Sequence, residues 1–203
     1  AGLDCRIVVV TIGTEAASML KQCAALGADE IVAIDPGSRE LDAPGIAAVL
    51  AAWVRGSGGA DLILCGRQAS DDDQGVVPLL LAESLGHAVT TLARDVTLAN
   101  GALTVTRATP EGDEVVRGKL PAVVTVSNEL GAPRFPTAKA KMAARKMSAE
   151  VVAIDGLGLD EAALAPSITL KRQFVPQIQG NCEFLSGSPA EIAKALMERI
   201  RAG

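Results

Sequence analysis

Over residues 6–86 the chain alternates short apolar runs with longer segments whose apolar residues recur at helical spacing. The short runs have the length of β-strands and cover residues 6–11, 30–34 and 62–65. The longer segments have the length of helices and cover residues 15–26, 44–55 and 77–85. Leu62-Ile63-Leu64-Cys65 is apolar at every position, as a strand buried on both faces of a sheet is. The alternation predicts a Rossmann-like α/β domain, with a parallel sheet and helices on both of its faces.

Beyond residue 86 the pattern changes to that of antiparallel strands. Residues 95–98 and 102–106 flank Asn100-Gly101, a strong signal for a two-residue turn, so a hairpin is predicted over residues 94–107. Val115-Val116 continue this antiparallel part. We therefore expect a β-hairpin inserted into the α/β domain.

The last third of the chain contains two further predicted strands and one capped helix. The strands cover residues 122–126 and 151–154, and residues 156–180 are predicted to be mostly irregular. Ser188, Pro189 and Glu191 form a capping box with proline in the first turn, which predicts a helix ending near Arg201. We therefore divide the chain into an α/β domain, residues 1–150, and a C-terminal arm with a helix, residues 151–203.

The composition argues against two classes of partner. Tyrosine is absent, and the chain has three phenylalanines and one tryptophan, too few aromatic side chains for binding nucleic acid by stacking. The net charge of −5 also argues against a general polyanion binder. No apolar run approaches the ~20 residues that a membrane-spanning helix needs. We therefore expect neither a nucleic-acid partner nor a membrane span.

The cysteines are scattered and form no Cys-x-x-Cys pair: Cys5, Cys23, Cys65 and Cys182. Three of them lie in apolar surroundings, so we expect buried free thiols in a reducing compartment rather than disulfides or a metal site. This predicts a cytoplasmic location. The chain enters its first strand without a start methionine or a leader, which we interpret as part of a longer polypeptide.

The loop over residues 66–75 carries the strongest functional signal. In a parallel sheet it leaves the same carboxyl edge as the loop at Ile12-Gly13, and ligands bind at this edge. Gly13 and Gly66 allow the backbone to approach a ligand closely, and free N–H groups at a following helix N-terminus suit a phosphate. The pattern therefore favours a nucleotide site.

Three consecutive aspartates in this loop leave other interpretations open. Asp71, Asp72 and Asp73 repel a phosphate unless they cap the helix or bind ribose hydroxyls, with Arg67 offsetting their charge. A solvated acidic loop with an aspartate at the N-cap fits the pattern equally well. A divalent cation on the aspartates is a weaker option, because Mg²⁺ in proteins usually needs a phosphate alongside. His87 is the only histidine and has no nucleophile or metal cluster near it, so we expect no catalytic residue and no metal site.

Three linked motifs resemble those of the β subunit of electron transfer flavoprotein. The first is GRQASDDDQG at residues 66–75, which fits the family's G-[KR]-Q-A-x-D-x-D loop. The others are the KLPAVVT strand and the PRF-x-T lead into a basic segment, both within residues 118–146. They occur in the family's order and spacing, and the resemblance covers the chain from residue 6 onward. The family's first strand and helix are missing from it.

The resemblance implies a fold, a partner and cofactors. The fold is Rossmann-like, of the adenine nucleotide α-hydrolase-like type, and the partner is an α subunit in a heterodimer. FAD is shared with that α subunit, and the β subunit holds a structural AMP. Carried over by position, the cofactor-binding residues are Ile12, Gly13, Gly66, Arg67, Gln68, Ala69, Ser70, Asp71, Asp72, Asp73, Gly75, Val76 and Val77. Val76 departs from the family, which often has a glutamine there.

The basic segment 137–147 has four positive charges and no acidic residue. On pattern alone it is a solvated basic helix. The resemblance implies instead a loop that docks a flavin dehydrogenase, with the charges steering a transient complex. The docking residues carried over are Ala138, Lys139, Lys141, Met142, Arg145 and Lys146. Ala138 replaces the usual anchor leucine and Lys141 an isoleucine, so either the partner differs from an acyl-CoA dehydrogenase or docking uses Met142.

The implied function is electron transfer without bond chemistry of its own. Electrons would pass from a flavin dehydrogenase through the shared FAD toward a membrane quinone reductase. One alternative is a flavin-bifurcating version, in which a second FAD takes the place of AMP in the 66–77 site. The other is an adenine-nucleotide-binding module without a redox role.

Overall fold

The computed structural model describes residues 4–71, 73–99, 101–177, 180 and 182–202. The chain forms two compact units, Ala1–Thr169 and Leu170–Gly203. The first unit is an α/β structure built on two hydrogen-bonded sheets. Asp72 and Asn100, which belong to the predicted loop and hairpin turn, lie outside the described residues.

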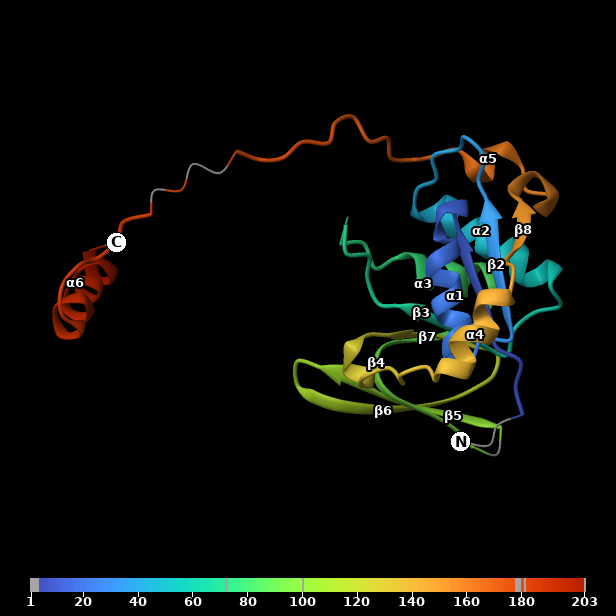
Figure 1. Cartoon of the computed structure of the whole chain (residues 1–203), viewed down its shortest axis with the longest axis horizontal. Helices are drawn as coiled ribbons and strands as arrows, with labels where there is room; N and C mark the ends of the chain where they lie inside the picture. Colours follow the sequence, from blue (N-terminus) through green and yellow to red (C-terminus); the bar gives the residue numbers. More distant parts are fainter. Residues whose placement is uncertain (1–3, 72, 100, 178–179, 181, 203) are drawn as a thin grey trace. The chain divides into compact units, whose positions relative to one another are not determined.

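The first sheet has three parallel strands in the order β1-β2-β8. They are β1 (Val8–Ile12), β2 (Glu30–Asp35) and β8 (Glu150–Ala153). On one face lies α1 (Ala17–Leu26), which follows the 3-10 turn η1 (Thr14–Ala16) and has α4 (Ala138–Lys146) beside it (Figure 1). On the other face lie α2 (Ala43–Gly56), η3 (Ile154–Leu157) and α5 (Glu161–Leu164).

Each face of this sheet has its own buried cluster. Leu20 of α1 packs with Ile31 and Ala33 of β2, and Val9 of β1 joins them. On the opposite face Ile34 and Val49 pack with Ile154, Leu164 and Val10. Because successive residues of a strand point to opposite faces, the apolar strands predicted from the sequence serve both clusters.

The second sheet has five strands in the order β3-β7-β4-β5-β6. They are β3 (Leu62–Gly66), β7 (Ala122–Val126), β4 (Ala88–Ala99), β5 (Ala102–Thr109) and β6 (Gly112–Lys119). β3 and the first half of β4 run parallel to β7, whereas β4, β5 and β6 are antiparallel. The helices α2 and α3 (Val77–Leu85) cover one face, where Ala47, Ala51 and Leu81 are buried, and η2 (Asn128–Leu130) follows β7.

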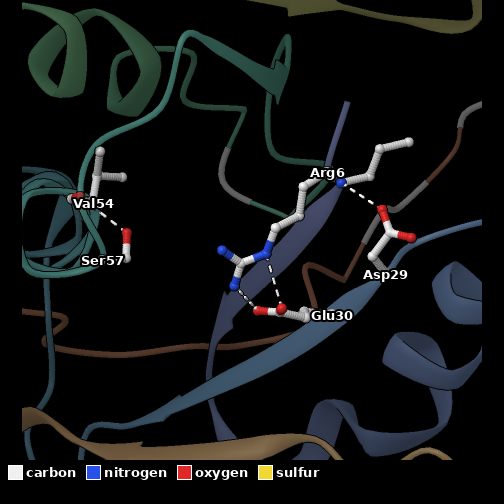
Figure 2. Close-up of polar contacts among 6 residues, drawn as sticks. Arg6, Asp29, Glu30, Val54 and Ser57 are labelled. Atoms are coloured by element: carbon white, nitrogen blue, oxygen red, sulfur yellow. Dashed lines mark hydrogen bonds and ion pairs between the residues drawn. The ribbon is translucent and has the colours of Figure 1, made fainter. Parts of the chain in front are cut away.

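Polar contacts fix the amino ends of β1 and β2 to each other (Figure 2). The Arg6 guanidinium forms an ion pair with Glu30, in which Nε donates to Oε1 at 2.8 Å. The backbone N–H of Ile7 donates to Asp29 Oδ2 at 2.7 Å. Asp29 lies in the turn before β2 and Glu30 is the first residue of β2, so these contacts join the two strands at their amino ends.

The second unit contains α6 (Pro189–Ala202), which begins with the predicted capping box. Ser188 N and Oγ donate to Glu191 Oε2 at 2.8 and 2.7 Å, and Glu191 N donates to Ser188 Oγ at 3.4 Å. These hydrogen bonds lower the pKa of the Glu191 carboxyl. The bond from the Ser188 hydroxyl has the largest effect, and the bond from the Ser188 backbone N–H adds to it. Leu196 and Ile200 of the predicted apolar face remain exposed.

The predicted α/β fold with a parallel-rich sheet is confirmed, and so are the capped C-terminal helix and the pairing of β4 with β5. Two details differ. β4 starts at Ala88, and residues 156–180, which were predicted to be mostly irregular, include α5 and the end of η3. β8 pairs with β2 inside the first unit.

Two burial predictions were wrong. Leu64 in the middle of β3 is 55% exposed, so this strand is not buried on both faces. All four cysteines are free, but Cys5 and Cys182 are exposed, and only Cys23 and Cys65 are partly buried. Among the described residues no helix is both long and apolar enough to cross a membrane.

Candidate functional site

A hollow of about 340 Å³ lies at the carboxyl end of β7, next to the 66–75 loop. The loop, α3, the middle of β4 and β7 contribute to its wall. The lining residues are Arg67, Gln68, Gly75, Leu79, Thr91, Leu92 and Thr125. The 66–75 loop predicted from the sequence therefore lines a real concavity at the expected edge of the sheet.

The loop is closed by hydrogen bonds within itself and to β7. Arg67 N donates to Val126 O at 2.9 Å, which continues the pairing of β3 with β7 by one residue. Ala69 N donates to Gln74 O at 3.0 Å. The Gln68 side-chain amide donates to both the backbone O and Oδ1 of Asp73, each at 2.7 Å. The amide of Gln68 is therefore bound to Asp73, whose backbone has a positive φ of 60°.

Gly75 is the one position of the loop where a side chain would collide with the loop itself. A Cβ placed there would lie 3.1 Å from the backbone O of Arg67. That distance is shorter than nearly all real Cβ contacts, and the neighbour is backbone rather than a flexible side chain. The closed loop therefore needs glycine at this position for space, although its φ is ordinary.

The start of α3 carries no side-chain cap. The N-cap residue is Val76, whose side chain makes no capping hydrogen bond. Pro78 lies in the first turn. The predicted aspartate N-cap is therefore not found in the described structure, whereas the exposed residues 66–71, 73 and 74 agree with the solvated loop of the same interpretation. The first turn keeps the partial positive charge of a helix N-terminus, which favours an anion.

A buried hydroxyl forms the floor of the hollow. Thr125 is 1% exposed, and its Oγ1 accepts a hydrogen bond from Leu92 N at 2.9 Å. Leu92 has a φ of 62° and lies where β4 loses its register with β7, between Thr90 and Ala93. This bulge separates the half of β4 that runs parallel to β7 from the half that is antiparallel to β5.

Sequence reasoning missed the four residues that complete the wall: Leu79, Thr91, Leu92 and Thr125. One signal was present, because Thr125 is the only polar residue of an otherwise apolar strand. The positive φ of Leu92 had no such signal, since leucine rarely adopts that conformation.

The predicted cofactor residues do not all lie around this hollow. Arg67, Gln68 and Gly75 line it, and Ala69, Ser70, Asp71, Asp73 and Val76 are exposed in or next to the loop. Val77 packs its side chain into the α2–α3 cluster instead. Ile12 lines a second hollow of about 440 Å³ beside β1, and Gly13 N donates to Ile34 O at 2.8 Å.

Cys65 lies in β3, directly before the 66–75 loop. Burial raises the pKa of the Cys65 thiol, which keeps it protonated and a poor nucleophile at neutral pH. Among the described residues no group of three or more His, Cys, Asp or Glu side chains could hold a metal ion.

The predicted docking residues gather on α4. Thr137 Oγ1 accepts from Ala140 N at 3.1 Å and caps the helix, and Ala144 is buried against the first unit. The six predicted docking residues are all exposed: Ala138, Lys139, Lys141, Met142, Arg145 and Lys146. Met142 is 64% exposed, and none of the four cations forms an ion pair within the described part of the chain. The helix thus presents a basic surface around one large apolar side chain.

The chain is similar to proteins of one family. The family model described as "Electron transfer flavoprotein domain" matches residues 1–157. The electron transfer flavoprotein subunit beta of Bacillus subtilis is 34% identical over 201 residues, which are 96% of this chain and 77% of that protein. Subunit CarD of the caffeyl-CoA reductase–Etf complex of Acetobacterium woodii is 30% identical over the same shares.

The Mycobacterium tuberculosis subunit beta is 33% identical over 168 residues, which are 81% of this chain. The match spans 63% of the length of that mycobacterial relative. The matches include the 66–75 loop and β7, the two parts of the chain that meet at the first hollow. The chain belongs to the electron transfer flavoprotein family and is a member of its β-subunit branch.

Proposed function

We propose that this chain is the β subunit of an electron-carrying heterodimer. In this complex the α subunit and this chain share FAD, and this chain holds AMP as a structural ligand at the hollow beside the 66–75 loop. The observation that carries the proposal is the closed loop itself, which lines a hollow at the carboxyl edge of the sheet in a member of this family.

The residues around the hollow fit a nucleotide. Arg67 supplies a positive charge, and the uncapped start of α3 favours a phosphate. Gly75 leaves the loop backbone open to close approach. Leu79 and Leu92 offer apolar surface for a base, and the exposed Asp71 and Asp73 carboxylates suit ribose hydroxyls. Bound here, AMP holds the loop and the start of α3 in place.

FAD, when bound to the complex, supplies the electron chemistry by accepting electrons from one partner and passing them to another. This chain contributes binding and orientation and no bond-making step. We propose that the basic surface of α4 docks a flavin dehydrogenase, which donates electrons that then leave toward a quinone reductase. Exposed cations that no neighbouring carboxylate neutralises speed the encounter with an acidic partner.

Coexpression with an electron transfer flavoprotein α subunit tests this function. The purified complex is expected to show a flavin spectrum, and extraction is expected to release one FAD and one AMP per heterodimer. Two FAD and no AMP would instead support the flavin-bifurcating alternative, for which the similarity to a subunit of the caffeyl-CoA reductase–Etf complex is the specific observation. A flavin-free monomer that retains AMP would support the non-redox module and reject our proposal.

The variant Gly75→Ala tests the nucleotide site. Its Cβ has to displace the Arg67 carbonyl, which deforms the loop. We expect the affinity of the heterodimer for AMP to fall about tenfold, which corresponds to ~1.4 kcal/mol, and its AMP content after purification to fall as a result. Gly156→Ala is the matched control, since a Cβ there has nothing within 4 Å and φ is ordinary. Unchanged AMP content in Gly75→Ala, with the control also unchanged, would place the nucleotide elsewhere.

A further inference from the structure

The hollow beside the 66–75 loop contains two threonine hydroxyls that act only as hydrogen-bond acceptors. Thr91 of β4 and Thr125 of β7 both line it. Thr125 Oγ1 accepts from Leu92 N at 2.9 Å, and Thr91 Oγ1 accepts from Arg107 Nη2 at 3.3 Å. Neither hydroxyl donates a hydrogen bond within the described part of the chain. Because a hydroxyl has a proton to donate as well as lone pairs that accept, both protons remain available to a ligand.

The bulge in β4 places these two side chains close together. β4 pairs with β7 on each side of the bulge, at Thr90 and again at Ala93. Two residues of β4, Thr91 and Leu92, therefore lie opposite the single residue Thr125 of β7. Bulges of this kind change the direction of a side chain beside a binding site. One strand thus supplies both the N–H group bound to Thr125 and the second hydroxyl of the hollow.

Burial makes the unused proton of Thr125 costly. The residue is 1% exposed, and it is the only buried polar residue in the described part of the chain. A buried donor that has no acceptor loses the free energy of its hydration without compensation. A ligand that brings an acceptor atom into the hollow removes that cost.

The other polar groups in the wall indicate which acceptor fits. Arg67 is the charged residue of the wall, and none of the described lining residues is acidic. A guanidinium has five N–H donors and no acceptor. Two hydroxyl protons and one guanidinium together favour a group that carries several oxygen acceptors and a negative charge. A phosphate group has both properties.

A second arginine lies behind Thr91 without lining the hollow. Arg107 of β5 pairs with Glu114 of β6, to whose Oε2 its Nη1 donates at 3.2 Å. Its Nε is buried and has no hydrogen-bond partner among the described residues, although buried N–H groups are usually paired. Its Nη2 is bound to Thr91. This bond occupies a lone pair of the Thr91 hydroxyl, so the proton of that hydroxyl is directed away from the guanidinium, and the positive charge makes it a stronger donor.

We propose that Thr91 and Thr125 bind the phosphate of AMP as hydrogen-bond donors, and that Arg107 is a positioning residue that orients the Thr91 hydroxyl. Arg107 acts through Thr91 and does not contact the nucleotide. The proposal rests on the proposed function, because it takes AMP as the ligand of this hollow.

The variant Thr91→Val tests the first part of the proposal. It keeps the shape of the side chain and removes the hydroxyl. The measurement is titration calorimetry of the heterodimer, freed of bound nucleotide, with AMP and with adenosine, which has no phosphate. We expect the affinity for AMP to fall about tenfold and the affinity for adenosine to stay within about twofold of wild type. Thr91→Ser, which restores a hydroxyl, is expected to bind AMP like the wild type.

The variant Thr125→Val extends this test to the buried hydroxyl. It also removes the acceptor of Leu92 N, so adenosine again serves to detect a general deformation of the hollow. We expect a loss of AMP affinity of about tenfold with little change for adenosine. Thr91→Val alone decides the proposal if Thr125→Val fails to fold.

The role of Arg107 is tested by a double-mutant cycle with Thr91. Arg107→Gln is expected to weaken AMP binding about threefold in the wild-type background and to have no further effect in the Thr91→Val background. Arg94→Gln is the matched control, because Arg94 of β4 also pairs with a carboxylate of β6, Asp113, but forms no hydrogen bond to the wall of the hollow. Equal losses from Arg107→Gln in both backgrounds, or an equal loss from Arg94→Gln, would overturn the positioning role.

The wild-type complex separates failure of this proposal from failure of the proposed function. Wild-type AMP binding with no loss in Thr91→Val, or with equal losses for AMP and adenosine, would overturn the phosphate contact and leave the nucleotide site in place. A wild-type complex that binds no AMP would reject the AMP site and this proposal with it.

Discussion

At the scale of single residues, Asp42 joins two distant segments of the first unit through one carboxylate. Its Oδ1 accepts from Gly45 N at 3.1 Å and caps α2, and its Oδ2 accepts from Ser167 N at 2.6 Å. Hydrogen bonds from backbone N–H groups lower the pKa of Asp42 below its ordinary value of 3.8, and the bond from Gly45 has the largest effect. One side chain therefore fixes both the start of α2 and the chain at Ser167, close to the end of the unit.

We expect Asp42→Ala to lower the unfolding temperature of the chain. Loss of an N-cap and of the bond to Ser167 predicts a decrease of roughly 2–4 °C, measured by circular dichroism. Asp61→Ala is the control, because no side-chain hydrogen bond or ion pair of Asp61 is present among the described residues. An equal decrease in both variants would show that the two bonds of Asp42 contribute nothing specific.

The same carboxylate predicts a pH dependence. Because the folded-state pKa of Asp42 is lowered, its contribution to stability is fully present above the ordinary value of 3.8 and is lost as the pH falls through the folded value. The difference in unfolding temperature between wild type and Asp42→Asn is therefore expected to be constant from about pH 7 to pH 5 and to shrink below about pH 4. A difference that shrinks between pH 7 and pH 5 would assign the effect to another group.

Residue-scale prediction from the sequence succeeded where side-chain chemistry is local and failed where the backbone departs from common conformations. The capping box of Ser188 and Glu191 depends on residues three positions apart, so it is visible in the sequence. The positive φ of Leu92 accompanies a hydrogen bond from its backbone N–H to Thr125, which is 33 positions away. No local pattern encodes such a contact.

At the scale of elements, α4 shows how charge and packing divide one helix. Ala144 is buried, whereas Lys139, Lys141 and Arg145 are exposed. Arg145 and Lys146 also lie in the last turn, where positive charge interacts favourably with the helix dipole. The cations therefore favour the helix itself and remain accessible to a partner.

Charge reversal on α4 tests the docking proposal. With the purified heterodimer we expect Lys141→Glu to reduce the second-order rate of flavin reduction by its flavin dehydrogenase partner about tenfold at low salt, and less at high salt. Arg117→Glu on β6 changes the net charge equally and is expected to leave the rate within twofold of wild type. Equal slowing by both variants would point to net charge rather than to a docking surface.

The extent of β4 was the main element-level error. Residues 88–94 lack the strict alternation of apolar and polar residues that is typical of a half-buried strand. This half of β4 pairs with β7, and its pairing with β5 begins only at Ala93. The antiparallel half has alternating burial and a turn signal, and it was predicted. The burial prediction for Leu64 was wrong for another reason. Its apolar run is typical of an interior strand, whereas in the described structure β3 is an edge strand.

At the scale of the whole molecule, the two compact units differ in what stabilises them. Among the described residues, all the buried clusters lie in the first unit, whereas the second exposes most of its large apolar side chains, including Phe174, Val175 and Phe184. We propose that this second unit, which is the larger part of the predicted C-terminal arm (residues 151–203), binds the α subunit and covers those side chains there.

Truncation separates the two roles. We expect a chain ending at Thr169 to unfold within about 2 °C of the full chain, because the core lies entirely in the first unit. The truncated chain is expected to lose copurification with the α subunit. Leu196→Lys should weaken copurification in the full-length chain, whereas Glu198→Lys, which also places a lysine on α6, should not. Full retention of the α subunit by the truncated chain would reject the arm as its binding element.

The bond between Asp42 and Ser167 also sets a tether length. About twenty residues separate Ser167 from the start of α6, so the start of α6 stays within roughly 80 Å of that anchor in any arrangement. A tether of this kind raises the effective concentration of α6 at a partner already bound by the first unit to the millimolar range. Two weak contacts made by one chain would then give an assembly tighter than either contact alone, with the anchor at Asp42 keeping the tether short.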